Sequence, residues 1–75
     1  MPATQKQIDY IDILCNEVGL DTRVKKLDFV SNLLGWWVPY LDEIAIPEAS
    51  KVIEKLKEMI EILADRESDK PYEDY

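Results

Sequence analysis

Apolar residues recur every three or four positions in three segments of the chain, a spacing typical of amphipathic helices. These segments span about residues 5–18, 22–34 and 47–66. The pattern predicts an all-α fold, a compact three-helix bundle formed by one domain of residues 1–66.

The ends of the predicted helices carry residues that favour helix termini. Thr4 is a good N-cap for the first helix, and Gln7, three positions later, completes a capping box. Asp21 or Thr22 can cap the second helix. Two glycines stand where left-handed C-caps are expected, one after each of these helices: Gly19 and Gly35.

The first helix has one apolar face, formed by Ile8, Ile11, Leu14, Cys15 and Val18. Tyr10 and Ile13 fall on the opposite side, where water is expected, so they are candidate partner contacts. The second helix is apolar on more than one side. We therefore predict that it is the central helix, covered by both neighbours; the alternative is that one of its faces mediates self-association.

The third helix presents an apolar stripe that ends near Leu63 and an opposite, charged face that we expect to be solvated. Pro47 suits its first turn. After Arg66 the apolar pattern stops, and residues 67–75 have the acidic, polar composition of a disordered tail. Tyr72 and Tyr75 in this tail are alternative anchors that could dock into a basic pocket of a partner.

The segment between the second and third helices is rich in aromatic residues: "GWWVPY", residues 35–40. Trp36 directly follows the glycine cap and is expected to fold back onto the end of the second helix. Adjacent side chains of an extended linker point to opposite sides, so the other indole should lie near the surface. Trp37, with Tyr40 beside it, is therefore either a partner contact or a lid packed over the bundle.

Composition narrows the class of partner. The chain has 75 residues and a net charge of −7. Residues 1–35 hold five acidic and four basic residues, whereas residues 36–75 hold eleven and five. Nucleic-acid affinity depends largely on cations that displace counterions from phosphates, so this balance disfavours tight DNA or RNA binding. A basic or mixed protein surface is the better match.

The residues for common catalysis are missing. The sequence has no histidine and no glycine-rich phosphate loop, and its single cysteine, Cys15, lies on an apolar helix face. We therefore predict a non-enzymatic protein without cofactor or metal. No secretory signal or membrane-spanning stretch is evident, which favours the cytoplasm, or the host cytoplasm for a phage protein.

The capped helices also carry a family resemblance. The sequence resembles a small helical module at the C-terminus of phage single-strand annealing recombination proteins of the RecT, ERF and Sak kinds, which also occurs in GemA-like phage regulators. The resemblance spans roughly residues 3–58. Its matched positions are Thr4, Gln7, Ile11, Leu14, Gly19, Leu20, Glu48, Ala49, Ser50, Val52, Ile53 and Leu56. This chain departs from the family at Ile46, where Thr or Ser is usual, and in the added aromatic residues of the linker.

The resemblance implies an interaction module of a phage or mobile element that binds a host protein of DNA replication, recombination or defence. One alternative is an acidic DNA mimic that inhibits a defence enzyme, in the manner of anti-CRISPR or anti-restriction proteins. Its acidic surface would comprise Glu54, Glu58, Glu61 and Asp65. The other is weak single-stranded DNA binding through stacked tryptophans and the cations Arg23, Lys25 and Lys26.

Overall fold

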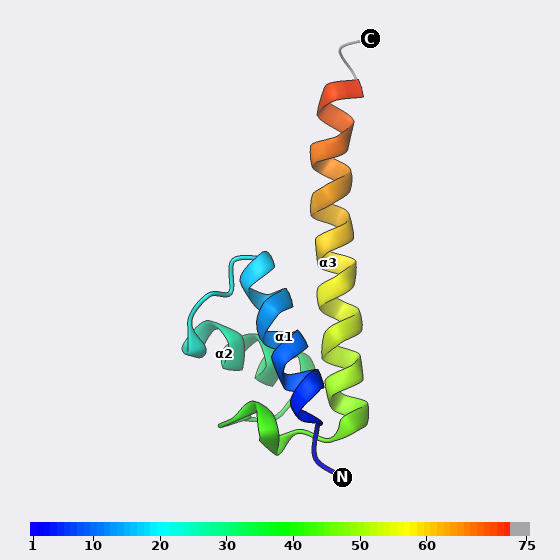
Figure 1. Ribbon diagram of the computed structural model, residues 1–75. Helices are drawn as coiled ribbons and strands as arrows, with labels where there is room; N and C mark the ends of the chain where they lie inside the picture. The colour runs from blue at the N-terminus through cyan, green and yellow to red at the C-terminus, as the bar shows by residue number, and fades with distance from the viewer. Residues whose placement is uncertain (73–75) are drawn as a thin grey trace.

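The computed structural model describes the backbone of residues 1–72 and the side chains of residues 1–63. It contains α1 (Gln5–Glu17), α2 (Arg23–Leu34), the short 3₁₀ helix η1 (Leu41–Glu43) and α3 (Ile46–Tyr72). The described backbone has no β-strand, so the predicted all-α three-helix fold is confirmed (Figure 1).

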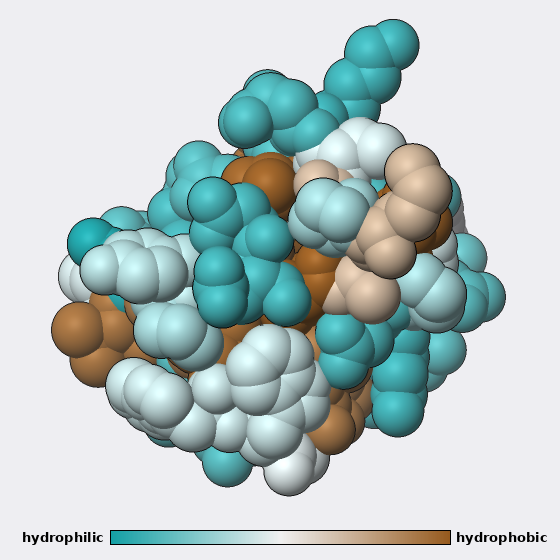
Figure 2. Space-filling model, turned by 90° about the horizontal axis from the view of Figure 1, so that it is seen from below, coloured by the Kyte–Doolittle hydropathy of each residue, from teal (hydrophilic) through white to brown (hydrophobic). Residues whose placement is uncertain are grey.

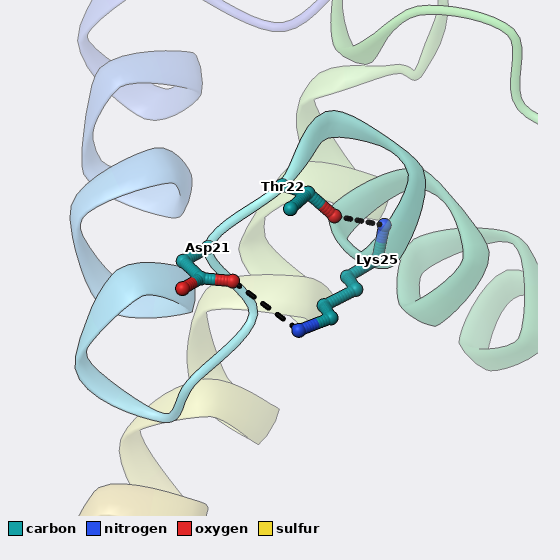
Figure 3. A network of polar contacts seen from close by, with 3 residues as sticks. All are labelled: Asp21, Thr22 and Lys25. Carbon is teal, nitrogen blue, oxygen red and sulfur yellow. Dashed lines mark hydrogen bonds and ion pairs between the residues drawn. The ribbon is translucent and has the colours of Figure 1, made fainter.

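The N-terminal caps form as the sequence predicts. The Thr4 hydroxyl accepts a hydrogen bond from the Gln7 backbone N–H at 3.1 Å, and the Gln7 side chain accepts one from the Thr4 N–H at the same distance. At α2 the Thr22 hydroxyl accepts from the Lys25 N–H at 3.2 Å, while Lys25 Nζ lies 3.3 Å from Asp21 (Figure 3). These bonds satisfy N–H groups that a helix start leaves without a partner.

α1 and α3 lie side by side and begin at the same end of the molecule (Figure 1). The segment before α1 pairs with the segment before α3 through an isolated antiparallel bridge, Pro2 with Ala45. The Ala3 N–H donates to the Ile44 carbonyl at 2.8 Å, and the Ile46 N–H donates to the Met1 carbonyl at 3.1 Å. This pairing fixes the first turn of α1 beside the first turn of α3.

The core is built mainly between α1 and α3, and α2 is not the central helix. α2 buries only Val30 completely, and its Val24 is 78% exposed. The prediction that both neighbours cover α2 is therefore wrong, because the main helix pair is α1 with α3 and α2 lies against one side of it (Figure 1). The buried residues are Ala3, Ile11, Leu14, Cys15, Val30, Val38, Ile44, Ala49, Val52 and Leu56.

α3 is longer than the apolar pattern predicts. It continues to Tyr72, although the apolar periodicity suggests an end near residue 66. The upper part of α3 extends beyond the end of α1 (Figure 1), so the helix continues there on its own backbone hydrogen bonds, which need no apolar stripe. The rest of the predicted tail, residues 73–75, lies outside the described part of the chain. None of the described helices is both long and apolar enough to cross a membrane.

Candidate functional site

The linker between α2 and α3 is held in place by buried residues. Gly35, in the left-handed conformation with φ +82°, ends α2. Three residues later the Val38 side chain is fully buried, and its backbone N–H donates to the Ser31 hydroxyl at 2.9 Å. Ile44 is also fully buried at the other end of the linker. The backbone of the linker is therefore held against the core at Val38 and at Ile44.

Trp36 joins the linker to the start of α3. Its indole N–H donates to one carboxylate oxygen of Glu48 at 2.9 Å, and the other oxygen accepts from the Ala45 N–H at 2.8 Å. These two bonds, led by that of Ala45, lower the pKa of Glu48 below the ordinary glutamate value. The Glu48 carboxylate thus accepts a hydrogen bond from the backbone at the start of α3, where no Ser or Thr side chain caps the helix. Trp36 also lines a hollow with Ser31 and Asn32 near the end of α2, where we predicted that it packs, but the fully buried linker residue is Val38.

Trp37 points away from the core. Its side chain is 71% exposed, compared with 39% for Trp36. A shallow hollow beside the two indoles is lined by α2 residues and by the glycine cap: Asp28, Ser31, Asn32 and Gly35. Together with Tyr40, which is 55% exposed, the two tryptophans form what we call the aromatic linker surface: Trp36, Trp37 and Tyr40.

Tyr40 is held by a cation from α2. The Arg23 guanidinium carbon lies 4.7 Å from the centroid of the Tyr40 ring, a distance at which the positive charge is attracted to the ring face. The sequence suggested that Arg23 contacts nucleic-acid phosphates. It carries no local signal for the stacking, because Arg23 and Tyr40 are far apart in the sequence.

A groove opens beside Tyr40, between α1, α2 and η1. It has a volume of about 370 Å³, and its apolar lining comes from Ile8, Leu27 and Leu41. Lys26 and Asp12 form an ion pair within it, and the Lys26 side chain is only 13% exposed. The groove therefore offers an apolar floor in which Lys26 and Asp12 neutralise each other, while Arg23 and Asp42 also contribute to its lining.

Comparison of the chain with protein-family models, with curated proteins and with solved structures gives no match. Figure 2 shows the end of the molecule at which α1 and α3 begin, the end that also carries the linker in Figure 1. Apolar surface (brown) is visible in the middle of this face, among residues of intermediate hydropathy (pale) and hydrophilic residues (teal). The aromatic linker surface is thus assigned on geometry and exposure.

The other residues singled out in the sequence lie elsewhere. Tyr10 and Ile13 are exposed on α1, and Lys57 Nζ lies 5.6 Å from the Tyr10 ring centroid. The carboxylate-bearing residues Glu54, Glu58 and Glu61 are exposed on α3. The side chains of Asp65 and Tyr72, and all of Tyr75, lie outside the described part of the structure.

Cys15 is buried in the core between the helices. Burial raises the pKa of its thiol to about 11, and the nearby cation Lys26 only partly offsets this. A protonated, enclosed thiol is a poor nucleophile. The side chains described in residues 1–63 form no cluster of three or more His, Cys, Asp or Glu that could hold a metal ion.

Proposed function

We propose that the chain is a non-enzymatic protein-interaction module whose contact site is the aromatic linker surface with the adjacent groove. The observation that carries this proposal is the 71% exposure of Trp37, which lies directly before the buried and hydrogen-bonded linker residue Val38. Tryptophan is enriched in binding hot spots, where its loss typically costs about 2 kcal/mol or more. Because the Val38 N–H and side chain hold the adjacent backbone, less backbone entropy is lost when the indole is bound.

The groove beside Tyr40 extends the contact site with a receptor for an apolar partner side chain. Its floor residues Ile8, Leu27 and Leu41 are partly buried, so a partner group would complete their enclosure. Such a pairing of a protruding indole with a receiving groove favours a folded protein partner. The partner class, a host protein of DNA replication, recombination or defence bound by a phage protein, comes from the resemblance described above.

The proposal is tested by quantitative affinity capture from host lysate with three forms of the chain: wild type, Trp37→Ala and Ile62→Ala. Ile62 is an exposed apolar residue on α3 and serves as the matched control. We expect Trp37→Ala to lose at least about tenfold of the captured partner and Ile62→Ala to retain it. Circular dichroism establishes that each variant is folded. Equal capture by folded Trp37→Ala and wild type would refute the proposal.

Single-stranded DNA binding has less support. The three cations expected to contact phosphates each have a protein partner: Lys25 lies at Asp21, Lys26 at Asp12 and Arg23 over Tyr40. Releasing these partners would cost part of the binding energy. Titration of the tryptophan fluorescence with a single-stranded oligonucleotide at low salt tests this function, and strong quenching would favour it.

A further inference from the structure

A second groove lies between α1 and α3, on a different side of α1 from the aromatic linker surface. Tyr10 and Leu14 line this groove, whereas Ile8 and Asp12 line the one beside Tyr40. Residues two positions apart are turned by about 200° around a helix, so the two grooves lie on opposite sides of α1. The second groove has a volume of about 540 Å³.

The floor of this groove is apolar. It is formed by Leu14 and the Tyr10 ring on α1 and by Ile60 on α3. The aliphatic stem and ammonium group of Lys57 lie against the groove, with Nζ 5.6 Å from the Tyr10 ring centroid. Leu63, one turn beyond Ile60, is 43% exposed and prolongs the apolar strip past the end of α1. An open apolar strip of this kind is suited to an apolar side chain of a partner.

Acidic residues form the edge of the same groove. Glu54, Glu58 and Glu61 follow one another at four- and three-residue spacing along α3, so they lie in a row on one side of the helix. Among the side chains that the structure describes, none of these three glutamates is within ion-pair distance of a lysine or arginine. Their charge is therefore directed at solvent, next to the apolar floor.

We propose that this groove binds an amphipathic helix of a partner protein, with the apolar face on Tyr10, Leu14 and Ile60 and with lysine or arginine facing the glutamate row. A helix that carries cations at the same spacing can meet successive carboxylates while its apolar residues enter the groove between two helices. The net charge of −7 opposes a second copy of the chain or a nucleic acid as the occupant.

The test uses a fluorescein-labelled synthetic peptide of about 18 residues, five helical turns, made of Leu, Ala, Lys and Arg with the leucines on one face. A control peptide of identical composition has the leucines distributed around the helix. Binding is measured by fluorescence anisotropy with the whole chain. We expect the amphipathic peptide to bind about tenfold more tightly than the control, and replacement of its central leucine by alanine to remove most of that gain.

Two sets of protein variants locate the binding site. The triple change Glu54→Gln, Glu58→Gln and Glu61→Gln should weaken binding about tenfold or more. The matched triple Asp28→Asn, Asp42→Asn and Glu43→Gln removes the same charge outside this groove and should weaken it no more than about twofold. Tyr10→Ala should also weaken binding about tenfold, whereas Trp37→Ala should leave it unchanged, which separates this site from the aromatic linker surface.

Four results would overturn the proposal: equal affinity for the two peptides, equal weakening by the two triple variants, undiminished binding by folded Tyr10→Ala, or binding that is insensitive to the central leucine of the peptide. The last result would mean that charge alone attracts the peptide, as for a DNA-mimicking surface. The leucine replacement changes only the peptide, so it decides the question even if Tyr10→Ala fails to fold.

Discussion

Replacing Val38 with alanine tests whether the linker is part of the core. Val38 is fully buried although it lies outside every helix. The change removes two methylene equivalents, worth about 0.8 kcal/mol each, and leaves a cavity that the neighbours fill only in part. We expect a loss of about 2 kcal/mol in the free energy of unfolding. For a chain of this size that corresponds to a fall in Tm of roughly 8–16 °C.

Val24→Ala is the matched control because it makes the same chemical change at a side chain that is 78% exposed. We expect its effect to stay within about 0.5 kcal/mol and to be slightly stabilising, since alanine favours helix. Thermal unfolding followed by circular dichroism gives both Tm values, and urea unfolding gives the free energies. If the two variants fall equally in Tm, or if Val38→Ala falls by less than about 2 °C, the linker is not part of the core.

Three further predictions follow from local contacts. Because hydrogen bonds lower the pKa of Glu48, its contribution to stability should be complete above the ordinary glutamate pKa of about 4.3 and be lost as the pH falls through the lower folded-state value. The difference in Tm between wild type and Glu48→Gln should accordingly shrink in acid, and a constant difference would contradict this. Because burial raises the pKa of Cys15 to about 11, a disulfide reagent at about pH 8 should label the native thiol far more slowly than the thiol in denaturant. Equal labelling rates would show that the thiol of the native protein is accessible to the reagent. Gly35→Ala should cost about 1 kcal/mol by urea unfolding, and Gly35→Asn less, since an added Cβ meets nothing within 4 Å and only the positive φ resists it. Equal stability of Gly35→Ala and wild type would contradict the left-handed cap.

The starts of α1 and α2 and the end of α2 could be predicted because their signals are local. The capping box of Thr4 and Gln7 spans four residues, and the Thr22 cap and the Gly35 cap each depend on a single residue and its immediate neighbours. The end of α3 had no such signal. The apolar stripe marks only the part of a helix that is packed, whereas the backbone hydrogen bonds can continue beyond it, as they do to Tyr72.

The arrangement of the helices depends on contacts that the sequence pattern does not carry. α2 has apolar residues on more than one side, which suggested a central position, but the pairing of Pro2 with Ala45 sets α1 directly beside α3. Val38 and Ile44 were missed as core residues because a linker has no periodicity from which burial can be read. The contacts of Trp36 with Glu48 and of Arg23 with Tyr40 were also missed, because they join residues that are distant in the sequence.

The linker buries a valine and exposes a tryptophan, the reverse of what stability alone would favour. A wholly buried indole of about 200 Å² is worth about 5 kcal/mol at 25 cal/mol per Å². With Trp37 71% exposed, less than about 1.5 kcal/mol of that is realised in the free chain. Trp37→Ala should therefore lower the free energy of unfolding by less than Val38→Ala does, although it removes a much larger side chain, and urea unfolding of the two variants measures this. A greater loss of unfolding free energy for Trp37→Ala than for Val38→Ala would mean that the indole mainly stabilises the fold. The smaller loss would leave most of its apolar surface to be buried by a partner.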